Sequence, residues 1–174
     1  MHYTSWGKRE KGEGEQRIPL LIEDGPEELG IFSEQNAAVG GQVWQLSHDE
    51  EGATATLGDG RVFRAAGDLS KQKRIKVTLD AKPFHFINES SSNWIIEDEA
   101  GKKIGQFSGA GNGVRRSILE FEDEAAAPLS DEERAGLSWF VRLILEGRLG
   151  TTSRTLIGTL LGFTIVGLIA FVVK

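Results

Sequence analysis

The chain has 174 residues, with 20 Lys and Arg against 26 Asp and Glu, which gives a formal net charge of −6. The acidic balance argues against a general nucleic-acid-binding protein, because such a protein would carry a broad basic excess. The sequence contains no cysteine, which excludes disulfides, thiolate metal sites and cysteine nucleophiles. The length predicts one domain together with a short additional segment.

The first 40 residues are polar and acidic. Residues 8–17 combine charged side chains with glycine, a composition that disfavours burial. We therefore expect residues 1–40 to form a loosely ordered acidic segment, in which the apolar run 18–22 adds an edge strand.

Residues 41–124 have the pattern of an antiparallel β domain. Apolar and polar residues alternate over short runs, and turn signals such as Gly58-Asp59-Gly60 separate them. We expect strands at residues 42–46, 53–57, 61–66, 74–79, 84–88, 93–98, 102–107 and 115–121. Strands do not alternate with helices, so a parallel nucleotide-binding sheet is disfavoured. The predicted fold class is mainly β, as a small antiparallel barrel or meander, followed by two C-terminal helices.

Alternation also predicts which side chains of these strands point inward, because successive residues of a strand face opposite sides. The expected inward residues are Val43, Val62, Ile75, Val77, Leu79, Phe84, Phe86, Trp94, Ile96, Ile104, Leu119 and Phe121.

Residues 129–147 predict an amphipathic helix. Ser130 and Glu133 have the spacing of a capping box at its start. Apolar residues at helical spacing share one face: Leu137, Phe140, Val141, Ile144 and Leu145. This face either packs on the preceding β domain or lies on a membrane surface, where Trp139 and the arginines would also be suitable.

Residues 155–173 carry no charged side chain, and twelve of these nineteen residues are Leu, Ile, Val or Phe. A helix of this length spans roughly 28 Å, close to the hydrocarbon thickness of a bilayer. We predict a C-terminal transmembrane helix, with a core helix enclosed by the β domain as the alternative. Residues 1–30 have no apolar run long enough for a signal peptide, so we expect insertion to depend on this C-terminal segment.

Basic residues flank the predicted membrane helix unequally. Arg148 and Arg154 precede it, and Lys174 follows it. Because positive charges near a membrane span tend to remain cytoplasmic, we expect a cytoplasmic N-terminal domain and a C-terminus across the bilayer. Gly158 and Gly162 form a GxxxG pair, which permits self-association or docking on integral membrane subunits.

Residues 93–107 combine an aromatic–aliphatic strand, a D-x-x-G turn from Asp98 to Gly101, and a strand that contains Ile104-Gly105. This hairpin resembles one of the tubby-like superfamily, which includes the phospholipid scramblases and the plant LURP-one-related proteins. Residues 60–65 are similar to another of their strands. The resemblance covers residues 42–145 and implies a barrel of up to a dozen strands around a hydrophobic C-terminal helix, with phosphoinositide or membrane-lipid binding.

The chain departs from that family pattern in two ways. We expect it to be short by several strands, and it has two apolar helices where the family has one. The central helix of the barrel is then either residues 137–145, with the anchor added after it, or residues 156–173, in which case no anchor exists.

One group of basic residues is the strongest candidate for contacts with phosphate or lipid headgroups. It consists of Lys71, Lys73, Arg74 and Lys76. Lys82, Arg115 and Arg116 extend this group if their strands are neighbours. Each basic residue near an anionic leaflet adds about 1 kcal/mol of attraction. The alternative is a solvated strand face, but tethering to a membrane increases the effect of weak contacts.

No set of residues suggests catalysis. The three histidines are scattered, and none has a second histidine at helical spacing, so we expect no metal site. The glycine-rich run 109–113 lacks the spacing of a P-loop and reads as a hairpin turn. The sequence therefore predicts a protein that is not an enzyme and uses no cofactor.

Three functional hypotheses follow. The first is a single-pass, C-terminally anchored membrane protein whose cytoplasmic β domain binds lipid headgroups or a protein partner. No nucleic-acid partner is expected. The second is a small accessory subunit of a multi-subunit membrane complex, such as a respiratory or transport assembly. The third is a lipid-moving activity by analogy with the scramblases, which would require oligomers because one thin helix offers no polar path through a bilayer.

Overall fold

The computed structural model describes residues 1–11, 15–90, 92–109, 118–122 and 129–149. These residues contain thirteen β-strands and one helix, residues 131–149, here termed the central helix. The strands are β1 (Tyr3–Trp6), β2 (Glu10–Lys11), β3 (Gln16–Ile22), β4 (Glu28–Phe32), β5 (Asn36–Val39), β6 (Gln42–Asp49), β7 (Gly52–Thr56), β8 (Val62–Ala66), β9 (Arg74–Leu79), β10 (Lys82–Asn88), β11 (Asn93–Asp98), β12 (Lys103–Ser108) and β13 (Ile118–Phe121).

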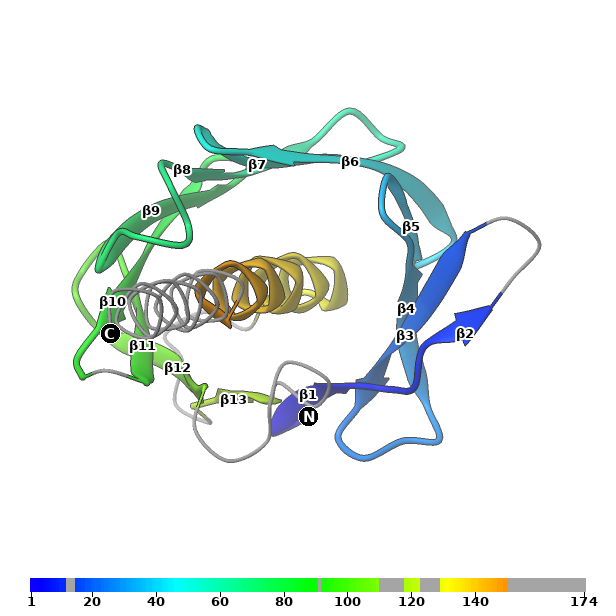
Figure 1. The fold of residues 1–174 in the computed structure, drawn as a ribbon, viewed down its shortest axis with the longest axis horizontal. Coiled ribbons are helices and arrows are strands. Elements are labelled where there is room, and N and C mark those ends of the chain that lie inside the picture. The colour runs from blue at the N-terminus through cyan, green and yellow to red at the C-terminus, as the bar shows by residue number, and fades with distance from the viewer. Residues whose placement is uncertain (12–14, 91, 110–117, 123–128, 150–174) are drawn as a thin grey trace, which may run out of the picture.

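Twelve of the strands form a closed antiparallel barrel, and the central helix runs through it (Figure 1). Neighbours in the wall follow the sequence from β3 to β13. The first strand closes the ring, since β1 pairs with β13 at Tyr3↔Glu120 and with β3 at Trp6↔Leu20. The remaining strand, β2, pairs only with β3. Closure satisfies the backbone along the strands and leaves no long free edge.

The mainly β, antiparallel fold with a C-terminal helix is therefore confirmed, but the expected transmembrane helix is not. Within the described parts of the chain, no helix has both the length and the hydrophobicity required to cross a membrane. The predicted membrane helix, residues 155–173, lies outside the described residues.

The described residues 1–11 and 15–40 are not a loosely ordered segment, because they contribute β1 to β5 and complete the barrel wall. Leu20, Phe32 and Val39 of this region are buried in the core. Composition is misleading here since the outer face of a barrel strand is solvated, so half of its residues are polar even when the strand is part of the wall.

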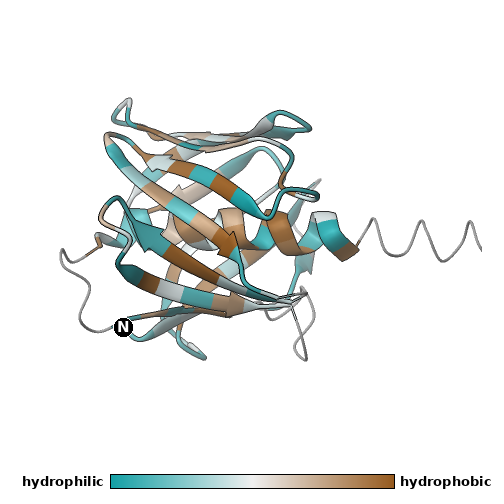
Figure 2. Cartoon of the chain, turned by 90° about the vertical axis from the view of Figure 1, so that its left-hand side faces the viewer, coloured by the Kyte–Doolittle hydropathy of each residue, from teal (hydrophilic) through white to brown (hydrophobic). Residues whose placement is uncertain are grey.

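Most of the predicted inward residues are confirmed, and Figure 2 shows hydrophilic and hydrophobic residues alternating along the strands. The buried ones are Ile75, Val77, Leu79, Phe84, Phe86, Trp94, Ile96, Ile104 and Leu119. Val43 and Val62 were assigned to the wrong face: they are 65% and 40% exposed, while the adjacent Trp44 and Phe63 are buried. A shift of one residue moves a side chain to the opposite face, and the larger aromatic side chains occupy the interior. Phe121 is only partly buried against the core.

The central helix is enclosed on nearly every side. Leu137, Phe140 and Ile144 are fully buried, and the polar residues Ser138 and Arg142 are buried as well. Of the two alternatives for the central helix, residues 137–145 therefore occupy the interior of the barrel. Of the two alternatives for the apolar face of this helix, packing on the β domain is therefore the one that the structure shows.

The start of the central helix is fixed by the predicted capping box. The backbone N–H of Ser130 donates to Glu133 Oε2 at 2.9 Å, and the N–H of Glu133 donates to Ser130 Oγ at 3.2 Å. The other carboxylate oxygen of Glu133 pairs with Lys82 Nζ of β10 at 2.6 Å. Close contact with the wall also requires glycine at position 136, where a Cβ would lie 2.6 Å from the ring of Phe63.

Replacement of Phe140 tests the enclosed helix. Phe140→Ala should lower the free energy of unfolding by about 3–5 kcal/mol, because it leaves a cavity between helix and wall. Val43→Ala, on the outer face, should cost less than about 1 kcal/mol. Denaturant titration followed by tryptophan fluorescence compares the two variants. Equal losses would contradict the assigned inner and outer faces.

Candidate functional site

The last described turn of the central helix lies at the open end of the barrel, against the loop that joins β8 to β9. Arg148 Nη2 donates to the carbonyl oxygen of Gln72 at 2.7 Å, and a Cβ on Gly147 would lie 3.0 Å from Ser70 Cβ. Leu149, the last described residue, is 50% exposed. We term this end of the barrel the C-terminal mouth, since the described part of the central helix ends here beside residues 67–73.

Arg148 therefore belongs to the mouth itself. Its guanidinium lies over the ring of Trp94 at 4.6 Å from the centroid, and burial lowers the pKa of this guanidinium from its usual value. The other residues predicted to flank the membrane helix or to pack it, namely Arg154, Lys174, Gly158 and Gly162, lie outside the described residues.

Asp68 organises the loop between β8 and β9. Its Oδ1 accepts hydrogen bonds from the N–H and the hydroxyl of Ser70, at 2.9 and 2.6 Å, and its Oδ2 pairs with Lys71 Nζ at 2.7 Å. Lys71 and Ser70 together hold the pKa of the Asp68 carboxyl at about 2, with the bond from Lys71 as the larger cause. Because the loop is fixed by these bonds, the basic residues that follow it have a defined position.

The structure separates the predicted basic group into two parts. Lys71 is committed to Asp68, whereas Lys73, Arg74 and Lys76 are exposed and make no side-chain hydrogen bond or ion pair with other described residues. Arg64 on the outer face of β8 has the same properties, and the sequence analysis missed it. Its signal was the alternation of β8, which buries Phe63 and Ala65 and turns position 64 outward.

The pairing of β8 with β9 brings these side chains to one part of the wall. Ala66 is opposite Lys76, and Arg64 is opposite Thr78, so Arg64 and Lys76 are diagonal neighbours on the outer face. We term Arg64, Lys73, Arg74 and Lys76 the basic surface. The predicted extension does not reach it: Lys82 lies at the opposite end of the barrel, paired with Glu133, and Arg115 and Arg116 are outside the described residues.

Carboxylates are concentrated at the opposite end of the barrel. The turns there and the start of the central helix carry Glu23, Asp24, Glu27, Asp59, Asp80, Asp98, Glu99, Asp131 and Glu132. The C-terminal mouth is mixed by comparison, since the turn between β6 and β7 contributes Asp49, Glu50 and Glu51 beside the basic surface. The barrel therefore has one acidic end and one end with a basic sector.

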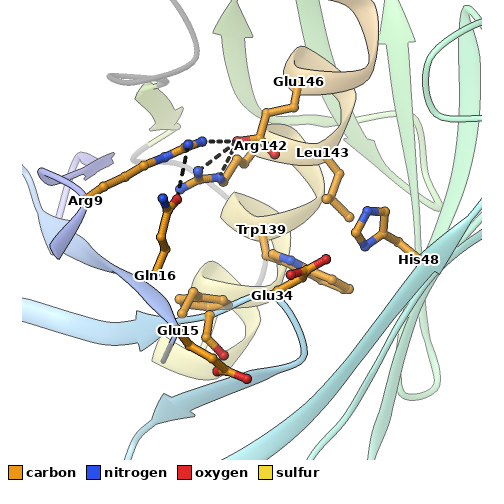
Figure 3. Close-up of a pocket in the computed structure, with 11 residues that line it drawn as sticks. Arg9, Glu15, Gln16, Glu34, His48, Trp139, Arg142, Leu143 and Glu146 are labelled. Atoms are coloured by element: carbon orange, nitrogen blue, oxygen red, sulfur yellow. Dashed lines mark hydrogen bonds and ion pairs between the residues drawn. The ribbon is translucent and has the colours of Figure 1, made fainter. Parts of the chain in front are cut away.

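A cleft of about 400 Å³ opens at the same mouth, between the central helix and strands β3, β4 and β6 (Figure 3). Phe32, Trp139 and Leu143 form its apolar lining. Its polar lining consists of Arg9, Glu15, Gln16, Ser33, Glu34, His48, Arg142 and Glu146. The size of this cleft is suitable for a small ligand, since ligand sites commonly occupy about 300–1,000 Å³.

Two arginines share one carboxylate in the cleft. Arg142 Nε and Nη2 both donate to Glu146 Oε1, at 3.0 and 2.7 Å, and the guanidinium lies 4.7 Å from the centroid of the Trp6 ring. The contacts of Arg9 are longer: its Nη2 lies 3.4 Å from the same Glu146 oxygen, and its Nη1 lies 3.5 Å from Gln16 Oε1. Arg142 is therefore firmly held, and Arg9 is not.

Two polar residues of the cleft, Gln16 and His48, continue the inward alternation at the ends of their strands. In β3, Gln16 precedes the buried Ile18, and in β6, His48 follows the buried Leu46 at the same spacing of two. Glu34 stands in the same relation to Phe32 of β4. A polar residue where the alternation requires an inward one was the signal for this cleft, and the sequence analysis did not use it.

Among the described residues, no three side chains of His, Cys, Asp and Glu lie close enough together to hold a metal ion. Comparison of the chain with protein-family models, curated proteins and solved structures gives no match. Its function is therefore inferred from the geometry of the barrel.

The ion pair in the β8–β9 loop gives a prediction for pH. The pKa of Asp68 is lower in the folded chain than its ordinary value near 3.9, so its ionised form stabilises the fold above about pH 4, and this contribution is lost as the pH falls towards 2. Lys71→Gln should raise the NMR titration midpoint of the Asp68 carboxyl. Lys73→Gln, with the same change of charge, should leave that midpoint in place, and a shift of equal size would contradict the assigned pair.

Proposed function

We propose that this protein is a non-enzymatic, membrane-tethered domain. Residues 155–173 anchor it in a bilayer, with the barrel on the cytoplasmic side, and the basic surface contacts anionic lipid headgroups. One observation carries the proposal: the described part of the central helix ends beside the loop that leads into the basic surface, where Arg148 bonds to Gln72. The anchor and the basic residues would therefore meet the membrane at the same end.

The chain between barrel and anchor is short. Residues 150–154 separate Leu149 from the apolar segment, and five extended residues reach at most about 18 Å. A bilayer that receives the anchor would therefore lie close to the C-terminal mouth, within the range where weak headgroup contacts become effective through tethering.

The distribution of charge favours the same orientation. Basic residues near an anionic leaflet contribute about 1 kcal/mol each, and this attraction decays within a Debye length of about 8 Å at physiological salt. The acidic end of the barrel is directed away from the bilayer in this arrangement.

The architecture supports the proposed relation to the tubby-like superfamily. A closed barrel of twelve strands around an apolar helix is what that resemblance implies, and the strands that the sequence analysis lacked come from residues 1–40. Because residues 137–145 occupy the interior, residues 156–173 remain for an anchor. Membrane-lipid binding by the barrel is the part of the resemblance that we propose here.

One observation favours the second hypothesis, an accessory subunit of a membrane complex. Ile31, Ala38 and Val43 are directly opposite one another on β4, β5 and β6, and they form an exposed apolar row on the outer wall. Exposed apolar patches mark protein contacts more often than isolated apolar residues do. Extraction in mild detergent distinguishes the hypotheses: co-migration with much larger partners favours the subunit.

The anchor is tested in the full chain. Leu161→Arg combined with Ile165→Arg should release the protein from membranes during alkaline carbonate extraction, because each central arginine costs about 2.5–3.5 kcal/mol of insertion. Leu161→Ala with Ile165→Ala is the matched control and should stay in the membrane pellet. Release of the unchanged protein by carbonate would contradict the proposed anchor.

The basic surface is tested by two double variants with equal changes of charge. Lys73→Gln with Lys76→Gln should weaken docking on anionic nanodiscs by about 2 kcal/mol. Lys102→Gln with Lys103→Gln, at the opposite end, should have little effect. Hydrogen exchange of residues 67–74 measures docking as added protection. Equal protection in all three proteins would contradict headgroup contact by this surface.

A further inference from the structure

The cleft at the C-terminal mouth has a positive and a negative side. In Figure 3, Arg9 and Gln16 approach the Arg142–Glu146 pair on one side of the central helix, and His48 lies on the other side beyond Leu143. The apolar lining between them comes from Phe32, Trp139 and Leu143. None of the four residues of the basic surface is among the described residues that line this cleft, so it is a separate site.

The positive side has one charge more than its carboxylate neutralises. Glu146 lies between Arg142 and Arg9, and two guanidinium groups around one carboxylate leave a net positive charge. Arg142 is held by two short bonds and by Trp6, but the contacts of Arg9 are 3.4 and 3.5 Å long and its side chain is half exposed. Arg9 is therefore the group that can turn its donors to an incoming anion.

The negative side is built on the turn between β4 and β5. Ser33 and Asn36 exchange hydrogen bonds across this turn, at 2.7 Å through the backbone and at 3.1 and 3.2 Å through the Ser33 hydroxyl. Between them, the carboxylate of Glu34 makes no hydrogen bond or ion pair with other described residues. A carboxylate beside an aromatic lining is the usual environment for an organic ammonium group.

We propose that this cleft binds a small zwitterion that carries a phosphate and an ammonium group, with the phosphate towards Arg9 and the ammonium towards Glu34 and Trp139. A simple anion would face Glu15, Glu34 and Glu146, and a simple cation would face the two arginines. A zwitterion satisfies both sides at once. The choice of phosphate as the anion rests on the proposed function, in which the mouth faces a bilayer. The inference that the ligand carries both charges does not rest on the proposed function.

The test uses the full chain in maltoside micelles, whose headgroups carry neither phosphate nor amine. Phosphocholine is titrated and followed by backbone amide NMR shifts at residues 33–35 and 48. It should bind at least about tenfold more tightly than inorganic phosphate or choline, because each half satisfies only one side. A half that binds as tightly as the whole would overturn the proposal.

Two variants identify the sides. Arg9→Gln and Glu34→Gln should each weaken phosphocholine binding by about fivefold or more, since each loses one charged contact. Lys8→Gln and Glu50→Gln make the same changes of charge at the mouth outside the lining, and both should bind within about twofold of the unchanged chain. Unchanged binding in Arg9→Gln and Glu34→Gln, or no amide shifts at all, would contradict the site.

The source of the zwitterion is decided by adding phosphatidylcholine to the micelles. Competition with free phosphocholine identifies a lipid headgroup as the ligand, and full binding without competition identifies a free phosphate–ammonium compound; both retain the site. The double variant Lys73→Gln with Lys76→Gln should keep phosphocholine binding. If phosphocholine binds but the protein does not dock on membranes, the proposed function is wrong and the ligand site in the cleft is retained. If the protein docks but phosphocholine does not bind, only the ligand site is wrong.

Discussion

The structure depends on the enclosure of one helix by a closed ring of strands. The ring is complete only because β1, the first strand of the chain, pairs with both β3 and β13. A hydrogen bond of 2.7 Å between the buried hydroxyls of Thr4 and Ser138 joins this closing strand to the helix. Loss of β1 would open the wall beside the helix and expose the backbone edges of its two neighbours.

Enclosure also determines how the polar residues of the helix are accommodated, because a helix inside a barrel has no solvated face. Arg134, Arg142 and Arg148 each place a guanidinium over an aromatic ring of the wall, at 5.6, 4.7 and 4.6 Å from the ring centroids. Cation–π contacts of this kind stabilise a partly desolvated charge. Arg142 and Arg148 belong to the last turns of the described helix, at the C-terminal mouth, whereas Arg134 lies in its first turn at the opposite end.

The C-terminal mouth brings together the features that bear on function. The helix end, the β8–β9 loop and the two-sided cleft lie at the same end of the barrel. In an antiparallel wall alternate connections share an end, and those after β4, β6 and β8 all lie at this one. Most of the acidic turns lie at the other end, whereas the acidic turn between β6 and β7 lies at the mouth. The proposed orientation relative to a membrane would therefore present the basic residues and the open cleft together.

The sequence by itself determined features that depend on neighbouring residues. These include the alternation of most strands, the capping box at Ser130 and Glu133, and the position of Arg74 and Lys76 in one strand with Lys73 directly before it. It did not determine that residues 1–40 are part of the wall, nor which of Val43 and Trp44 faces inward, since composition and alternation allow either result. The cleft was decided by tertiary structure, because Arg9 and Glu146 are 137 residues apart and meet only when the ring closes around the helix. Local patterns report local geometry, whereas ring closure depends on contacts between distant parts of the chain.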